Sequence, residues 1–362
     1  MPKSSIGKGI SSQPMPGSPR SWVLIGREGA IAQLAPLIAA HQVSQPVRLV
    51  QVDANEGISI DELTPLAGPD ASSILWIGPH HQSPRTAVPG LFLKAHDGRK
   101  IPIGWLPELP DRLAGYAQAA ATVVRRQQEA QSNQQSNQQS NQILAFLGPR
   151  DDRSQDLIRQ LETPFKSLPY HTVYHTVQWT ADRLRQPDLQ QALSCGLGAA
   201  LYVGHGFPNG WAGYGGVTFE SFADVPHWKA IGALLCLTCH NASRHQVSLS
   251  FAEEWVLSGR CGVAIAATGA TRHALNRVFA ERLCQSIQAG AAGAIELSTI
   301  APTLAHCLSH PSLQRLPLAR YRIIGDPAMP LLGAEGSIEA ATAVFAPAPD
   351  AVLPPLPLEL WG

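Results

Sequence analysis

Short runs of consecutive apolar residues alternate along the chain with segments of helical periodicity. Residues 22–26 (WVLIG), 47–54 and 72–80 are apolar or β-branched runs of strand length. Between the first two, residues 30–42 have helical spacing that Pro36 interrupts. Strands that are apolar throughout, separated by helices, are typical of a parallel sheet that is covered on both faces. The pattern therefore predicts an α/β fold.

A similar alternation follows a polar repeat, SNQQSNQQSNQ, at residues 132–142. Before it, residues 101–130 predict a turn and then a long alanine-rich helix from about Asp111. A polar low-complexity tract cannot bury a core, which favours a linker or an exposed loop. The expected organisation is a flexible arm (1–20), an N-terminal α/β subdomain (21–130), a linker (131–142), a second α/β subdomain (143–335) and a proline-rich tail (336–362).

The second subdomain has its own strands and helices. Its predicted strands are residues 143–148, 171–179, 198–206, 231–239, 262–269 and 321–329. Its predicted helices cover residues 154–165, 248–259 and 271–290. The helix at 248–259 has a serine cap and ends at Gly259, both of which are ordinary helix boundary signals.

Composition and charge exclude several classes of protein. Hydrophobic residues make up 44% and charged residues 15% of the 362 positions, so extended disorder is not expected. The formal net charge is +0, without the basic excess expected of a partner of nucleic acid or of an anionic membrane. No apolar run reaches the length of a membrane span, and residues 1–22 lack the apolar core of a secretion signal. The expectation is a cytoplasmic protein whose six cysteines are reduced thiols.

Two predicted strands end in residues with catalytic chemistry. Tyr-Val-Gly-His-Gly places His205 directly after one strand, and Leu-Thr-Cys places Cys239 after another. Ligands of open α/β sheets bind at the carboxyl ends of strands. If the two strands are neighbours, a thiol and an imidazole flank one crevice, as thiol nucleophilic catalysis requires. The backbone N–H groups of Gly206 and Cys239 are candidates for an oxyanion hole.

The segment CLTCH at 236–240 also allows other interpretations. It matches the pattern of covalent haem attachment, and it contains a C-x-x-C pair that could serve redox chemistry. Cys236 lies inside an apolar run, where its side chain should be buried, and strand alternation should separate it from Cys239. A zinc site formed by Cys239, His240 and His245 is a further alternative. Cys239 could also be an ordinary buried thiol.

The order of these segments resembles the gingipain-type cysteine peptidases of family C25, which have a caspase-like fold. Five features carry the resemblance: Gly204-His205-Gly206 with Trp211, Cys239 with Asn241, Phe251-Ala252-Glu253, Gly325-Asp326-Pro327, and IPIGWLPELP before a long helix. Trp105 departs from the pattern, because an arginine is usual at that position. The similarity extends over about residues 100–330.

The resemblance implies a cysteine endopeptidase that acts on polypeptides through a thioester. Cys239 would be the nucleophile, His205 the general base and acid, and Gly206 and Cys239 the oxyanion donors. Either Asp151 or Asp152 would orient the histidine. Trp211, Asn241 and Asp224 would contact the substrate. No cofactor is implied, although some relatives bind calcium through loops.

The resemblance also suggests cleavage after a basic residue, which needs an acidic pocket. The candidates for that pocket are Asp151, Asp152, Asp156, Glu220 and Asp224. A rival hypothesis is an inactive caspase-like scaffold that binds a protein partner through the proline-rich tail. A third is an effector protease that is activated by cleavage at the SNQQ loop or by a partner.

Overall fold

The structure is a computed structural model, and it describes residues 20–53, 58–95, 97–134, 142–166, 174–291, 299–314, 316 and 318–331. Its main strands are β1 (Ser21–Gly26), β2 (Val47–Gln51), β3 (Ala71–Pro79), β4 (Phe92–Lys94), β5 (Lys100–Glu108), β6 (Gln142–Gly148), β7 (Tyr174–Thr180), β8 (Ala199–Val203), β12 (Ile231–Leu237), β13 (Cys261–Ala267) and β14 (Tyr321–Gly325). Three short strands, β9 (Gly206–Phe207), β10 (Gly210–Trp211) and β11 (Val217–Thr218), form a separate small sheet.

The helices of the described residues alternate with these strands. They are α1 (Glu28–Gln33), α2 (Ala35–Gln42), α3 (Ile60–Ala67), α4 (Pro84–Ala87), α5 (Pro110–Gln134), α6 (Asp152–Lys166), α7 (Gln186–Leu193), α8 (Phe251–Leu257), α9 (His273–Ala291), α10 (Ile300–Ser309) and α11 (Pro311–Gln314). Three 3₁₀ turns cover Gly213–Gly215, Glu220–Phe222 and Leu318–Arg320. No described helix has the length and apolar character needed to cross a lipid bilayer.

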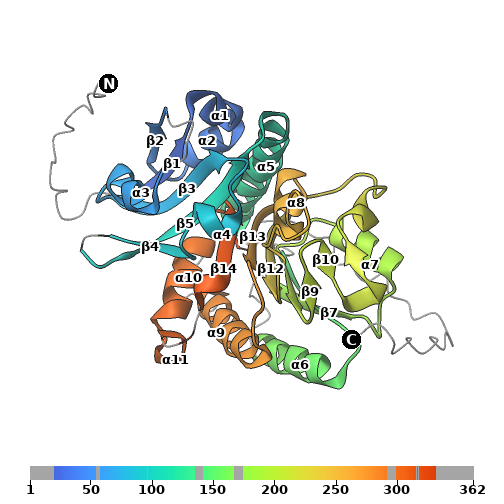
Figure 1. Cartoon of the computed structure of the whole chain (residues 1–362). Coiled ribbons are helices and arrows are strands. Elements are labelled where there is room, and N and C mark those ends of the chain that lie inside the picture. The colour runs from blue at the N-terminus through green and yellow to red at the C-terminus, as the bar shows by residue number, and fades with distance from the viewer. Residues whose placement is uncertain are drawn as a thin grey trace.

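One mostly parallel sheet runs through the molecule, in the order β2-β1-β3-β5-β14-β13-β12-β8-β6-β7, with β4 paired to β5. Neighbouring strands are parallel except at β13–β14 and β4–β5. Helices cover the sheet, with α1, α2, α5 and α8 packed together on one side and α6, α9 and α10 on the other (Figure 1). This architecture confirms the predicted α/β class with a mostly parallel sheet.

The two predicted subdomains share this sheet. Strand β14 lies between β13 and β5, and it pairs with β5 through Ile323↔Gly104 and Ile324↔Trp105. In Figure 1, β14 is the red-orange strand between teal β5 and the later strands. A side chain at Gly104 would place its Cβ only 2.0 Å from the Gly325 carbonyl oxygen, so glycine permits this pairing. Most of residues 131–142, all but one residue of the 1–20 arm and the whole tail at 336–362 lie outside the described residues.

The prediction of a turn at the start of residues 101–130 is wrong, because residues 100–108 form strand β5. The proline and glycine residues of this strand favoured a turn in the sequence analysis, although residues 101–107 are all buried in the sheet. The neighbouring helix boundaries agree with the sequence. Ser250 caps α8 in a capping box with Glu253, and Gly259 follows that helix with φ +71°.

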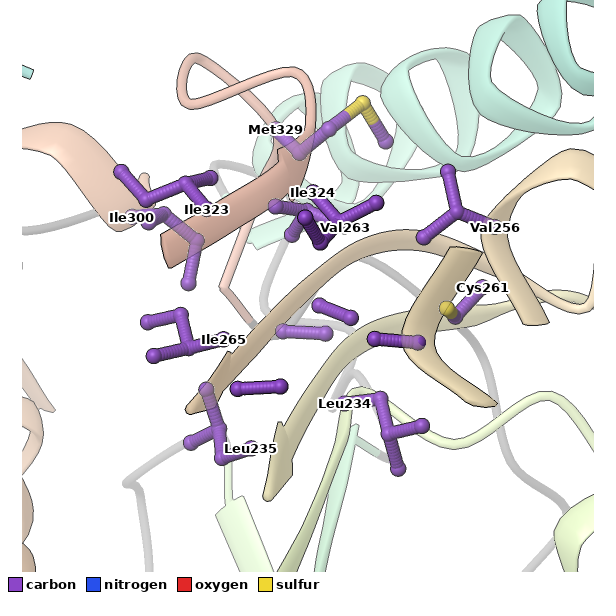
Figure 2. Close-up of a cluster of buried hydrophobic side chains, with 14 of the residues drawn as sticks. Leu234, Leu235, Val256, Cys261, Val263, Ile265, Ile300, Ile323, Ile324 and Met329 are labelled. Atoms are coloured by element: carbon purple, nitrogen blue, oxygen red, sulfur yellow. The ribbon is translucent and has the colours of Figure 1, made fainter. Parts of the chain in front are cut away.

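The core is built on the central strands, and Figure 2 shows part of it where α8, α10 and β14 meet β12 and β13. Leu234 and Leu235 from β12 and Ile265 from β13 are fully buried, as are Ile323 and Ile324 from β14. This packing keeps β12 and its neighbours in fixed positions, so the loops at their carboxyl ends start from a rigid base.

A buried polar cluster joins the N-terminal strands to the turn after β14. Asp326 is fully buried; its Oδ1 accepts hydrogen bonds from Trp22 Nε1 at 2.8 Å and from the Ala328 N–H at 2.8 Å. Its Oδ2 lies 2.5 Å from His41 Nε2. The backbone N–H of Asp326 donates to the Tyr116 hydroxyl at 3.0 Å. Asp326 therefore closes a turn and connects β1, α2 and α5 to it.

Candidate functional site

His205 and Cys239 follow adjacent parallel strands. The register of β8 and β12 pairs Val203 with Leu237, and each of the two candidate residues comes two positions after this last pair. The two loops are in contact, because a Cβ at Gly206 would lie 2.7 Å from the Cys239 carbonyl oxygen. His205 is exposed and Cys239 is partly exposed. The prediction that the two strands are neighbours is confirmed, and neither side chain is sealed in the interior.

The loop after β13 contacts the sulfur of Cys239. The Thr271 backbone N–H donates to Sγ at 3.2 Å, and the Thr271 carbonyl and hydroxyl oxygens each lie 3.5 Å from the same sulfur. The backbone and side chain of Thr271 therefore fix the position of the sulfur at the end of β12. Thr271 is not among the residues that the sequence singled out, because its contact depends on the pairing of β12 with β13.

Asn276 holds the end of β12 in place from the second turn of α9. Its Nδ2 donates to the carbonyl oxygen of Leu237, the last residue of β12, at 3.0 Å. Its Oδ1 accepts a hydrogen bond from the Tyr321 hydroxyl at 2.7 Å. Burial raises the pKa of Tyr321, so its hydroxyl remains a proton donor. The backbone that leads to Cys239 is thus fixed by two other elements.

Trp211 and Asn241 connect the segment after His205 to the segment after Cys239. Both side chains are buried. Asn241 Nδ2 donates to the carbonyl oxygens of Phe207 and Gly210 at 2.7 Å each, and its Oδ1 accepts from Trp211 Nε1 at 3.0 Å. The Trp211 ring also stacks on Tyr202 at a centroid distance of 4.4 Å. The polar atoms of this pair are engaged within the protein, and their predicted substrate contact stays a prediction.

Asp151 and Asp152 follow β6, which is the neighbour of β8, so they reach the same edge of the sheet as His205. Asp151 Oδ1 accepts the Ser154 N–H at 2.9 Å and so caps α6, whereas Asp152 lies in the first turn. Burial and the positive charge of Arg153 lower the pKa of His273; the carboxylate of Asp151 acts against this lowering, and His205 adds to it. Asp151 and His205 therefore act on a common neighbour, which favours Asp151 over Asp152 as the acidic residue near the histidine.

The structure does not bring Asp224 to this edge. Asp224 precedes β12 and lines a surface cavity with Cys195 and Lys229. These two residues form an isolated bridge just before β8 and β12 begin. Asp224 therefore belongs to the amino end of these strands, at the edge of the sheet opposite Cys239.

Within the part of the chain that the structure describes, the remaining cysteines and histidines are not grouped as metal ligands. The described residues contain no group of three or more His, Cys, Asp or Glu side chains that could hold a metal ion. Cys239, His240 and His245 therefore do not form such a group. Cys236 is fully buried, and burial raises its pKa to about 12. A buried thiol in the middle of the sheet does not suit haem attachment or thiol exchange, as the apolar run around it predicted.

The thiols should differ in their reactivity. We expect iodoacetamide at neutral pH to label Cys239 first, because Cys236, Cys261, Cys284 and Cys307 are buried. Burial raises the pKa values of these four thiols, and of Cys195 to a smaller degree, so they stay protonated at neutral pH. Mass spectrometry of digested samples at successive times would give the order. All six thiols should react at similar rates in urea; faster labelling of any other thiol in the folded protein would contradict this expectation.

Comparisons with known proteins give the family of the chain and confirm its predicted caspase-like fold. The model of "Peptidase family C25" matches residues 113–332, more than half of the chain. The crystal structure of the Arg specific cysteine proteinase gingipain R superposes with a TM-score of 0.61 at 12% identity, covering 86% of this chain and 78% of that one. A complex of the Porphyromonas gingivalis RgpB pro- and mature domains gives a TM-score of 0.60 at 13% identity, covering 87% and 79%. No curated protein sequence matches.

Proposed function

The chain belongs to peptidase family C25 and is a cysteine peptidase, and we propose on this basis that Cys239 is its nucleophile and His205 its general base and acid. The observation that carries this proposal is the register of β8 and β12, in which both residues follow the pair Val203↔Leu237 by two positions. The partial exposure of Cys239 and the exposure of His205 leave both side chains accessible to a polypeptide.

The proposed reaction begins with attack of the Cys239 thiolate on the carbonyl carbon of a peptide bond. The N–H groups of Gly206 and Cys239 hold the oxyanion of the tetrahedral intermediate. His205 gives a proton to the amine as it leaves, and a thioester remains on Cys239. Water then attacks the thioester while His205 accepts its proton, and the carbon–sulfur bond breaks to release the acid product and the Cys239 thiolate. The hydrogen bond from the Thr271 N–H holds the sulfur in position for the attack.

The other residues of the site act through these two. Asp151 is proposed to orient His205, supported by its position after β6 and its electrostatic effect on the shared neighbour His273. Trp211 and Asn241 are proposed to act as positioning residues, since their hydrogen bonds tie the β9–β10 hairpin to the loop after Cys239. Glycine at 206 is required by the close approach of these two segments, where a Cβ would lie 2.6 Å from Thr238 Oγ1.

Cleavage after a basic residue is one specificity hypothesis for this chain, since the similar gingipain R is described as Arg specific. The inactive scaffold is the rival to any enzymatic function. The scaffold hypothesis predicts the same fold but no turnover of a peptide. The accessible thiol and imidazole at the ends of two neighbouring strands argue against this hypothesis.

Cleavage of a peptide library by the wild type and by Cys239→Ala tests the function. We expect the wild type to cut a subset of peptides and Cys239→Ala to cut none, with product ends identified by mass spectrometry. Cys195→Ala is the matched control, because it removes a partly exposed thiol at the other end of the sheet and should leave turnover unchanged. Equal turnover by wild type and Cys239→Ala would exclude Cys239 as the nucleophile.

A further inference from the structure

An arginine lies against the loop that contacts the Cys239 sulfur. The Arg320 guanidinium donates through Nη1 to the Ala270 carbonyl oxygen, and a Cβ at Gly269 would lie 3.7–4.0 Å from its Cδ, Nη1 and Nε atoms. The next residue, Thr271, donates its N–H to Cys239. Arg320 itself is exposed. A guanidinium group with further N–H donors is therefore present beside the proposed nucleophile.

Two more exposed arginines surround the same edge of the sheet. Arg272 directly follows Thr271, and Arg153 lies in the first turn of α6, close enough to His273 to lower its pKa together with His205. Among the described residues, neither of these arginines nor Arg320 forms an ion pair with a carboxylate. The rim of the site therefore carries three arginine charges that no carboxylate of the described residues neutralises by contact.

Fewer carboxylates than arginines are available at this edge of the sheet, because some of the acidic residues already contact other groups of the protein. Of the acidic residues that could accept a basic side chain, Asp156 pairs with Arg159, and Asp224 lies at the opposite edge of the sheet in a cavity that Glu220 also lines. Asp151 caps α6. Asp152, also after β6, and Asp182, which follows the neighbouring strand β7, are exposed carboxylates at this edge. This balance does not suit a lysine or arginine in the substrate.

The chemistry of the rim fits a carboxylate. A guanidinium presents its N–H groups in a planar fork that matches the two oxygens of a carboxylate, and this geometry gives strong, directional recognition. Resting on the catalytic role proposed for Cys239, we propose that the site selects polypeptides with an acidic side chain next to the cleaved bond, and that Arg320 is its main specificity-determining residue. Arg153 and Arg272 add a positive field that attracts acidic segments.

Binding by the full-length Cys239→Ala protein, which leaves peptides intact, tests this preference. The probes are fluorescein-labelled peptide pools with randomised flanks and a central Asp, Asn or Arg, and anisotropy gives the Kd. We expect the Asp pool to bind about tenfold tighter than the nearly isosteric Asn pool, and the Arg pool to bind weakest. Adding Arg320→Gln should bring the Asp-to-Asn ratio close to one, and Arg320→Lys should retain part of it. Lys229→Gln, which removes one charge beyond the other end of β12, should leave the ratio unchanged.

Equal or tighter binding of the Asn or Arg pools, an Asp-to-Asn ratio that survives Arg320→Gln, or binding of no pool would each overturn the preference. Parallel cleavage assays separate this result from the fate of the catalytic proposal. Cleavage after arginine by the wild type that is lost in Cys239→Ala would support the nucleophile and reject the acidic preference. Charge-selective binding by Cys239→Ala without any turnover by the wild type would support the preference and reject the catalytic assignment.

Discussion

Replacing His205 with alanine is expected to lower kcat/KM for a cleaved peptide by about 10²–10⁴-fold, the range over which a positioned general base and acid contributes. The reason is the position of His205 just after β8, next to the strand that leads to Cys239. From this position the imidazole would both activate the thiol and protonate the leaving amine. The measurement is steady-state hydrolysis of a fluorogenic peptide chosen from the library. KM should change much less than kcat, because the imidazole acts on the reacting atoms rather than on distant parts of the substrate.

The matched control for His205→Ala is His310→Ala, which removes a partly exposed histidine between α10 and α11. It should retain full activity. Alkylation of Cys239 by iodoacetamide offers a second measurement that needs no substrate, and His205→Ala should slow it at neutral pH. If kcat/KM of His205→Ala stayed within threefold of the wild type, His205 would have no role in the chemical step.

Asp326→Ala is expected to destabilise the protein by about 3–5 kcal/mol, the usual cost of removing one member of a buried charged or hydrogen-bonded pair. The substitution leaves the Trp22 indole N–H and the Ala328 N–H without their acceptor, and it removes the carboxylate that lies 2.5 Å from His41 Nε2. All of these groups are buried, so water cannot replace the lost contacts without opening the core. The free energy of unfolding would be measured by urea titration followed by tryptophan fluorescence.

Asp97→Ala is the control for Asp326→Ala, since it removes an exposed aspartate that pairs with the nearby Arg99. It should shift the urea midpoint far less. Asp326→Asn should fall between the two, because an amide oxygen can still accept from Trp22 or Ala328 while the charge is lost. A midpoint for Asp326→Ala equal to that of the wild type would show that the cluster does not hold the N-terminal strands to the turn after β14.

Local patterns predicted the elements that build the site. The apolar runs before His205 and Cys239 are strands β8 and β12, and Ser250 and Gly259 bound helix α8 as their positions indicated. These features depend on residues that are close in the sequence, so patterns of burial, capping and backbone freedom reveal them. The rule that parallel strands present their carboxyl ends at one edge then placed both residues at that edge, and the pairing of β8 with β12 makes the two strand ends neighbours.

Features that depend on contacts between distant segments could not be predicted in this way. Strand β5 was hidden by its prolines and by Gly104, whose lack of a side chain has meaning only against Gly325. Thr271 and Asn276 have no local motif; they matter because β13 and α9 lie beside the end of β12. Asp224 was attractive for its charge alone, and the fold places it at the wrong end of the strand.

The position of β14 has a consequence for how the protein is made. Residues 321–325 occupy the sheet position between β5 and β13, so the central sheet is incomplete until this late segment has left the ribosome. Closing such distant pairs carries a large entropic cost and slows folding. Tyr321, which completes the hydrogen bonds behind the β12 strand end, arrives with that segment. Nascent chains that end before residue 321 therefore lack a complete catalytic site. Peptide hydrolysis by this protein should begin only after that segment has been synthesised.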